Sequence, residues 1–285
     1  MKWIVGLLLL SVTGVAFADG PRQSTKVPRF DAAVERGVQY LLKADASIRM
    51  DGGRMTLISY ALYKCAVPKT DQRVLLGING ALERSKGTVY QPSNSYEHIY
   101  VAGVDAMLLA DVGENKGEQY RANLQVICNY VQSAQRADGS WSDSPNTPAD
   151  VSMSQYGVLA LWACQRAGCT VAPETVEKAA GFFLRRGQAD GGWAYRPGTS
   201  DGPGAGNSTH NMAMAGAGAL GICRLMLYGS RPKVGAPKKE KETVFAGTDA
   251  IQKEEEEELA PGVVPSAFPE YKAAISAGEL DSRVD

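Results

Sequence analysis

Apolar residues recur at helical spacing along most of the chain, in two kinds of segment that alternate with each other. The first kind carries apolar residues at about i, i+3, i+4 and i+7 with charged residues opposite, which is typical of a helix with one face in water. The second kind is apolar nearly all round and rich in Ala, Gly and Ser, which favours a helix packed closely on both sides. Almost no segment alternates with the period of a strand. The pattern therefore predicts an all-α protein.

The two kinds of segment pair into helical hairpins, about four of them, each roughly 50 residues long. We expect the amphipathic, outer helices over residues 30–44, 74–85, 121–135 and 173–187. We expect the apolar, inner helices over residues 51–65, 96–110, 150–164 and 209–223. When the last two inner segments are aligned, Gly157 coincides with Gly216 and Cys164 with Cys223. The sequence thus predicts a repeat of helix pairs.

A short motif precedes each of the last two inner segments. It reads RADGSWSD over residues 136–143 and QADGGWAY over residues 188–195. The Asp-Gly pair favours a turn, and the Trp that follows can fold back and pack between neighbouring hairpins. The motif residues are Asp138, Gly139, Trp141, Asp190, Gly191 and Trp193.

With these motifs the chain resembles the prenyltransferase/squalene oxidase repeat family, whose QW-type repeats occur in squalene–hopene and oxidosqualene cyclases and, more loosely, in protein prenyltransferase β-subunits. The resemblance covers about residues 30–229 and is strongest in the last two hairpins. It implies an α/α toroid, in which inner helices ring a central cavity and outer helices wrap around them. Such toroids commonly have more hairpins than we count here. A small closed ring, an open horseshoe, half of a site completed by another subunit, and an unclosed solenoid therefore all stay open.

The family's chemistry does not carry over to this chain. The D-x-D-D acid motif of the cyclases is absent, and so is the D-D-x-x-D motif of diphosphate-ionising synthases. The prenyltransferase zinc site would match at Asp150 and His210, but Ser152, a poor zinc ligand, stands in the cysteine place. We therefore expect neither terpene cyclase nor zinc prenyltransferase activity, and no metal or cofactor. A helix N-cap is the simpler explanation of Asp150.

Both histidines of the chain fall at predicted starts of inner helices. His98 and His210 would lie at the same end of the ring as Glu97 and Asp150. A pocket there would combine imidazoles and carboxylates with the positive ends of helix dipoles, and Glu97 or Asp150 could act with His210 as general acid and base. Helix capping and ordinary surface polarity explain the same residues without a site. The expected rim of the cavity adds Tyr96, Tyr100, Ser152 and Asn211.

The first 18 residues, MKWIVGLLLLSVTGVAFA, have the pattern of a secretory signal peptide. Lys2 precedes an apolar run that is too short to span a bilayer, and small residues lead to a cleavage site near Ala18–Asp19. We therefore expect export to the periplasm or the extracellular space. A linker over residues 19–29 would lead to the repeat domain over 30–229. Residues 230–285 are rich in Pro, Lys and Glu and predict a charged, mostly disordered tail, in which 268–280 could form a short helix or a docking peptide.

Charge and cysteine content narrow the classes of function. The formal net charge of −1 gives no general attraction to nucleic acid. Export would permit disulfides, but the odd number of cysteines leaves at least one thiol unpaired, and no C-x-x-C spacing occurs. Their apolar, helical surroundings favour buried cysteines that act as small hydrophobic residues. They are Cys65, Cys128, Cys164, Cys169 and Cys223.

Two classes of function remain. The first is a non-catalytic binding or scaffold module of the cell envelope that uses the cavity, its rim or the tail to engage a protein, lipid or polysaccharide, as a single chain or as an oligomer that completes the ring. The second is an enzyme of unknown specificity, cyclase-like or carbohydrate-active, with its site at the inner-helix N-termini. The missing acid motif and the substituted zinc position favour the first class.

Overall fold

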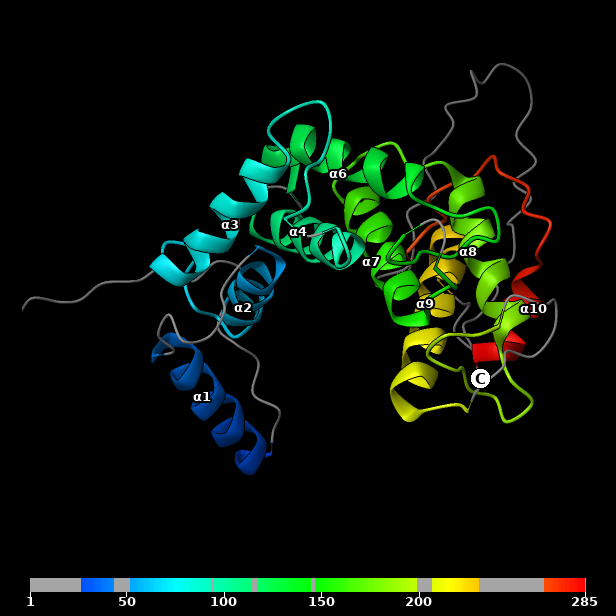
Figure 1. Cartoon of the computed structure of the whole chain (residues 1–285), viewed down its shortest axis with the longest axis horizontal. Coiled ribbons are helices and arrows are strands. Elements are labelled where there is room, and N and C mark those ends of the chain that lie inside the picture. Colours follow the sequence, from blue (N-terminus) through cyan, green and yellow to red (C-terminus); the bar gives the residue numbers. More distant parts are fainter. Residues whose placement is uncertain are drawn as a thin grey trace, which may run out of the picture.

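Figure 1 shows a computed structural model of the chain, which describes residues 27–43, 52–93, 95–113, 117–144, 147–198, 207–230 and 264–284. Within these ranges all regular structure is helical and no strand occurs, so the expected all-α class is confirmed. The predicted signal peptide lies outside the described residues, as does most of the linker that follows it.

Each helix that the sequence predicts is present, with ends that differ from the expected ones by a few residues at most. The outer helices are α1 (Pro28–Lys43), α3 (Gln72–Arg84), α6 (Arg121–Ser133) and α8 (Pro173–Arg186). The inner helices are α2 (Gly52–Lys64), α4 (His98–Val112), α7 (Val151–Arg166) and α9 (His210–Tyr228). A short 3-10 helix, η1 (Glu118–Tyr120), precedes α6, and α10 (Ala277–Val284) ends the described chain.

The helices pack in two layers. The inner helices contact one another in series, α2 with α4, α4 with α7, and α7 with α9. Each of α3, α6 and α8 packs against two neighbouring inner helices. In Figure 1 the inner helices follow a curve, with α3, α6 and α8 on its outer side. The apolar segments of the sequence therefore form one layer, in which each helix contacts its neighbours in the series and is covered on one side by outer helices.

Trp141 and Trp193 anchor the turns that join an outer helix to its inner helix. The indole Nε1 of Trp141 donates to the carbonyl of Val131 in α6, and that of Trp193 donates to the carbonyl of Phe183 in α8, both at 2.8 Å. Both side chains are almost wholly buried. A buried indole N–H needs a hydrogen-bond partner. In both hairpins that partner is the carbonyl ten residues before the tryptophan.

Each indole also faces a glycine of the inner helix that follows it. A Cβ on Gly157 of α7 would lie 2.7 Å from the Trp141 ring, and a Cβ on Gly216 of α9 would lie 2.4 Å from the Trp193 ring. Each tryptophan thus lies between the two helices of its own hairpin. The ring of Trp193 also lies beneath the guanidinium of Arg283 in α10, 5.0 Å from the ring centroid. Packing of these rings against neighbouring hairpins, as the motif predicts, stays a prediction.

The Asp-Gly turn is the part of the motif that reaches the next hairpin. In the first copy Asp138 accepts from the N–H of Ser140 at 3.1 Å, and Gly139 has a φ of +88°. A Cβ on Gly139 would lie 2.0 Å from the carbonyl oxygen of Lys178 in α8. Gly191 has the same φ but nothing near its Cβ position. Glycine is therefore needed at Gly139 for both conformation and space.

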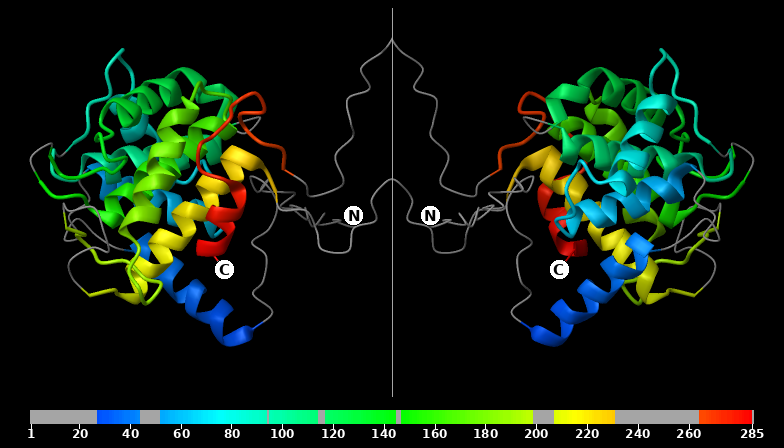
Figure 2. Two further views of the ribbon diagram at one scale, coloured as in Figure 1. Left: turned by 90° about the vertical axis from the view of Figure 1, so that its right-hand side faces the viewer. Right: turned by 90° about the vertical axis from the view of Figure 1, so that its left-hand side faces the viewer.

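The first helix is the least covered part of the described chain. Only Val38 of α1 is buried, while Phe30 and Tyr40 are exposed. In Figure 2 α1 extends away from the other helices. The amphipathic pattern of α1 therefore leaves much of its apolar side uncovered.

The last described residues, 264–284, pack on the body of the molecule. Helix α10 contacts α9 and α8, and Leu280 is completely buried. Glu177 of α8 accepts hydrogen bonds from the hydroxyl of Tyr271 and from the N–H of Ile275. The expectation of a mostly disordered tail over 230–285 therefore does not hold for 264–284, where apolar side chains find a partner surface on α8 and α9. Residues 231–263 lie outside the described residues.

Candidate functional site

The N-terminal ends of α4 and α7 bring three of the expected site residues together. The hydroxyl of Ser152 donates to Asp150 Oδ1 at 2.7 Å, and the hydroxyl of Tyr100 is hydrogen-bonded to Ser152. Asp150 is 1 % exposed and also accepts from the N–H of Met153 at 2.9 Å. Asp150 is therefore the N-cap of α7, as the sequence predicts.

The second carboxylate oxygen of Asp150 is less well satisfied. Oδ2 is buried and has no hydrogen-bond partner among the described residues. The nearest cation is the guanidinium of Arg196, at 3.8 Å, and this group also contacts Asp143 at 2.7 Å. The Asp150 carboxylate is thus held by its capping role on one side and by an ion pair on the other.

Tyr100 is a neutral hydroxyl at this position. Burial raises its pKa well above the ordinary value, and the hydrogen bond with Ser152 offsets only part of that effect. A phenol with a raised pKa can donate or accept a hydrogen bond but does not act as a base near neutral pH. Tyr100 therefore positions neighbouring groups.

His98 is hydrogen-bonded through both ring nitrogens. Nδ1 lies 2.9 Å from the hydroxyl of Tyr130, and Nε2 lies 2.9 Å from the carbonyl oxygen of Ser142. A carbonyl can only accept, so Nε2 carries the proton and Nδ1 accepts from Tyr130 in the neutral imidazole. Both nitrogens already serve to join α4 to α6 and to the turn after it.

The remaining expected site residues do not join this cluster. Glu97 pairs with Arg54 at 3.3 Å, with 40 % of its side chain exposed. Tyr96 is 73 % exposed. His210 and Asn211 are exposed at the start of α9. Across the described ranges, no three or more His, Cys, Asp and Glu side chains form a group that could hold a metal ion. The structure thus brings Asp150, Ser152 and Tyr100 together and leaves the others apart.

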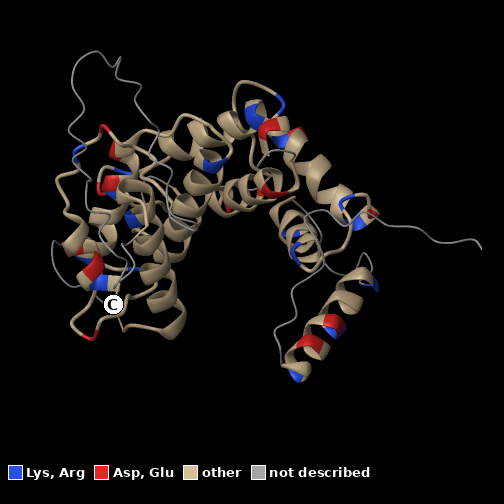
Figure 3. Cartoon of the chain, turned by 180° about the vertical axis from the view of Figure 1, so that it is seen from behind, with Lys and Arg blue, Asp and Glu red and all other residues tan. Residues whose placement is uncertain are grey.

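The inner helices have a side that the outer helices do not cover, which we call the inner face (Figure 1). Tyr100 and Tyr156 are in edge-to-face contact across α4 and α7, with ring centroids 5.0 Å apart. In Figure 3 the ribbons of α7 and α9 carry few charged positions. The partly or fully exposed residues of the inner face are Tyr60, Lys64, Tyr100, Met107, Asp111, Ser152, Gln155, Tyr156, Leu159, Trp162, Arg166, Met214 and Gly218.

Asp111 is the charged centre of the inner face, and the sequence reasoning missed it. Its carboxylate accepts from Tyr60 at 2.8 Å, from Lys64 at 3.0 Å and from Arg166 at 2.8 Å, and so joins α2, α4 and α7. Burial alone would raise the pKa of Asp111, but hydrogen bonds from Lys64, Arg166 and Tyr60 outweigh burial and hold it below its usual value. The available signal was a basic residue in the last turn of each inner helix that flanks α4, Lys64 in α2 and Arg166 in α7.

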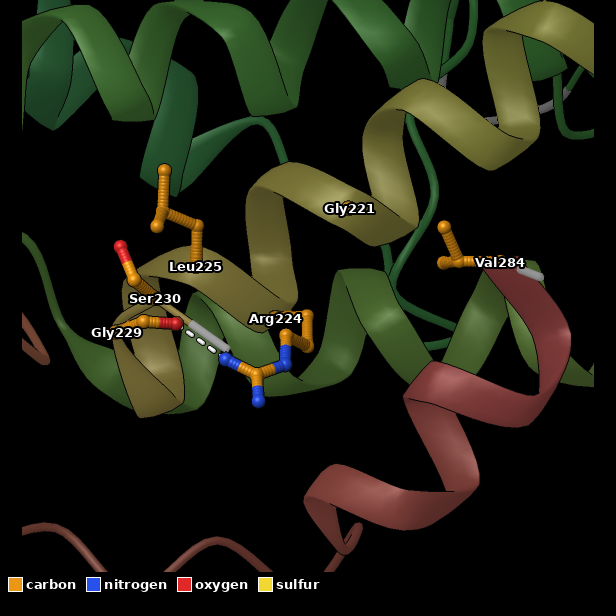
Figure 4. Close-up of a pocket in the computed structure, with 6 residues that line it drawn as sticks. All are labelled: Gly221, Arg224, Leu225, Gly229, Ser230 and Val284. Carbon is orange, nitrogen blue, oxygen red and sulfur yellow. Dashed lines mark hydrogen bonds between the residues drawn. The ribbon is translucent and has the colours of Figure 1, made fainter. Parts of the chain in front are cut away.

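A cavity of about 310 Å³ lies at the other end of α9 from His210, beside α10 (Figure 4). Its charged lining residue, Arg224, is already engaged with Asp281 at 2.9 Å and with the carbonyl of Gly229. No candidate acid or base of the sequence lies there. The lining residues are Gly221, Arg224, Leu225, Gly229, Ser230 and Val284.

Comparison of the chain with protein-family models, with curated proteins and with solved structures found no match. Among the helices that the structure describes, none is long and apolar enough to cross a membrane. The function therefore has to be argued from the geometry of the inner face and of the Asp150 cluster.

Proposed function

We propose that the chain is a helical repeat protein of the α/α toroid type, with an open arc of hairpins, and that it is a non-catalytic binding or scaffold module of the cell envelope. Two observations support the repeat. The motif tryptophans make the same hydrogen bond and face the same glycine position in two hairpins. The inner helices contact one another in series. Export is part of the proposal and depends on the pattern of residues 1–18.

The observation that carries the binding function is the composition of the inner face. Its middle is made of aromatic and aliphatic side chains such as Tyr156, Leu159 and Trp162, and Met214 is 75 % exposed. The carboxylate of Asp111 is already neutralised by cations of the same surface. Several partly exposed apolar side chains on one side of a helix layer are typical of a site that binds an apolar partner.

The candidate catalytic groups have structural duties that support the same conclusion. Asp150 caps α7, and both nitrogens of His98 are hydrogen-bonded within the protein. A general acid or base must present a free proton position to its substrate. His210 is exposed and is not joined to a carboxylate by any contact among the described residues.

Trp162 provides a direct test of binding at the inner face. Trp141 and Trp193 are buried, whereas Trp162 is partly exposed, so its fluorescence should respond to a ligand on this surface. Neutral phospholipid vesicles, cell-wall polysaccharide and an amphipathic helical peptide would be titrated in turn. We expect one of the three to shift the emission, and Met214→Glu to weaken that binding.

Leu75→Glu is the matched control, because Leu75 is a 40 % exposed apolar residue on the outer helix α3. It should leave both the emission shift and the affinity unchanged. Equal loss of binding in both variants, or no response of Trp162 to any of the three probes, would contradict binding at the inner face.

An enzyme with its site at the inner-helix N-termini is the second candidate. It is favoured by the chain of hydrogen bonds from Tyr100 through Ser152 to Asp150, and by the Oδ2 of Asp150, which accepts no hydrogen bond from the described residues. This candidate requires that polysaccharide or peptide is cleaved by the parent protein and that Tyr100→Phe lowers kcat while the melting temperature stays the same. If the parent protein cleaves neither polysaccharide nor peptide, the enzyme candidate is contradicted and the binding function is the one that is supported.

A further inference from the structure

Three thiols gather where the end of α7 packs against α6. The sulfur of Cys164 lies 3.4 Å from the carbonyl oxygen of Leu124, and that of Cys169 lies 3.7 Å from the carbonyl oxygen of Arg121. Because these carbonyls are one turn apart on the same helix, the two sulfurs occupy neighbouring places in the seam. Cys128 of α6 is the third thiol, with its sulfur 3.4 Å from the carbonyl of Thr170.

The backbone at the end of α7 brings Cys164 and Cys169 together. The N–H of Cys169 donates to the carbonyl of Cys164 at 3.0 Å, and the N–H of Gly168 donates to the carbonyl of Gln165 at 3.0 Å. Gly168 is left-handed, with a φ of +75°. These features define a Schellman motif, in which the side chains at the places of Cys164 and Cys169 come into contact.

The end of α2 shows what normally occupies these two places. There the N–H of Val67 donates to the carbonyl of Leu62 at 3.0 Å, and Ala66 has the left-handed conformation, with a φ of 65°. Leu62 and Val67 therefore occupy the two places at which the motif usually has an apolar pair. At the end of α7 a pair of thiols replaces that apolar pair.

The two thiols differ in exposure and in acidity. Cys169 is 8 % exposed, whereas Cys164 is completely buried. The hydrogen bond from Cys164 and the charge of Arg121 lower the pKa of Cys169 despite its burial. Hydrogen bonding with Cys128 and Cys169, together with burial, raises the pKa of Cys164 well above its usual value. An outer, more acidic thiol and an inner, less acidic one are the two parts that thiol–disulfide exchange requires.

We propose that Cys169 and Cys164 form a thiol–disulfide exchange site that takes a low-molecular-weight disulfide as its substrate. The Cys169 thiolate attacks one sulfur of the disulfide, which forms a mixed disulfide and releases one thiol. Cys164 then attacks the Cys169 sulfur, which closes the Cys164–Cys169 bond and releases the second thiol. Two protein thiols are oxidised, one disulfide is reduced, and the two protons leave on the released thiols. This site is independent of the binding function proposed for the inner face.

Peptide mapping of the folded protein tests the pairing. The reduced protein is treated with oxidised glutathione, its remaining thiols are alkylated, and it is digested with trypsin. Trypsin cleaves after Arg136 and Arg166. The three thiols therefore fall on three different peptides, and each possible pair gives a linked product of its own mass. We expect the Cys164–Cys169 link to predominate, and Cys223, which is completely buried, to be alkylated only after unfolding.

Variants separate the two steps. Cys128→Ala should keep the link, and Cys169→Ser should abolish it. Cys164→Ala should stop the reaction after the first step, so that glutathione remains bound to Cys169. A predominant Cys128–Cys164 link, or three unlinked thiols in the treated parent protein, would overturn the proposal. Both of these outcomes are read from the parent protein, so the test does not depend on whether a variant folds.

Discussion

Gly157 and Gly216 leave space for the buried rings of Trp141 and Trp193, because glycine has no side chain. Each lies in the middle of an inner helix, where glycine weakens the helix by about 0.5–1 kcal/mol relative to alanine. Each also lies under a buried indole ring, with no room for a Cβ. The tryptophan can reach its carbonyl partner on the outer helix only because this space is open.

Gly157→Ala should therefore destabilise the protein, by about 1–3 kcal/mol, because the new methyl group overlaps the ring of Trp141. The free energy of unfolding in urea would measure the effect. Gly218→Ala is the matched control, because Gly218 is also an interior position of an inner helix but has nothing within 4 Å of its Cβ position. That variant should gain about 0.5–1 kcal/mol. Two losses of equal size would show that overlap with the ring of Trp141 is not what destabilises Gly157→Ala.

The sequence predicted more about individual residues than about their partners. The motif residues and the N-cap role of Asp150 follow from local patterns, and the structure has this cap. The partners of His98 do not follow from a local pattern, because they come from α6 and from the turn after it. Such partners are determined by long-range packing. A repeat alignment shows which helix ends correspond to each other, but not which side chains they contact.

Helices α2, α4 and α7 are joined near their C-terminal ends by Asp111. Helix α4 contributes the carboxylate, α2 contributes the phenol of Tyr60 and the ammonium group of Lys64, and α7 contributes the guanidinium of Arg166. The pKa of Asp111 is lower in the folded protein than its ordinary value. A depressed carboxyl pKa adds stability above the unfolded pKa and loses it as the pH falls through the folded pKa.

We therefore expect the urea midpoint of the parent protein to fall as the pH is lowered below about 4. Asp111→Asn should start from a lower midpoint at neutral pH and should show a shallower fall over the same range. Glu83→Gln, at a carboxylate that is 69 % exposed on α3, is the control and should follow the parent profile. A parallel fall in parent and Asp111→Asn would show that other groups cause the acid loss.

Helix α10 was the element that the sequence left least defined. Its short length and its place after a charged stretch gave no clear period, whereas the long inner and outer helices were predicted to within a few residues. Helix α10 is stabilised by its packing on α8 and α9, which are distant in the sequence. A pattern confined to 268–280 cannot reveal that surface.

Leu280→Ala should cost about 2–5 kcal/mol, because Leu280 is completely buried against the body of the molecule. Thermal unfolding followed by circular dichroism would measure the change. Gly278→Ala is the control within the same helix, since nothing lies within 4 Å of its Cβ position, and it should not lower the melting temperature. If Leu280→Ala melts with the parent, α10 does not pack on α9 in solution.

At the scale of the whole molecule, the helices differ in how many neighbours cover them. Helix α7 contacts α4, α6, α8 and α9, whereas the main contact of α1 is with α2 alone. The free energy of local unfolding is lowest where the fewest apolar groups are buried. The arc should therefore be most stable at its middle and least stable at α1.

Native-state hydrogen exchange would show this gradient. Amides of α1 should exchange by local opening at a free energy well below that of global unfolding, and amides of α7 should exchange only on global unfolding. The amides of α10, which is short but buries Leu280, should lie between them. Equal protection of α1 and α7 would mean that the described chain opens as one unit.

The packing of α10 on α8 and α9 also limits how copies of the chain can assemble. A head-to-tail series of copies needs an open edge at both ends of the arc. Each copy contacts one neighbour through its first edge and another neighbour through its second edge. The chain covers one of its edges with its own C-terminal helix (Figure 2). Among the described residues the opposite edge, formed by α1 and α2, carries Phe30, Tyr40 and Leu57 as exposed side chains. Association through the edge of α1 and α2 alone would therefore stop at a pair of copies, because a pair leaves no second edge of this kind open.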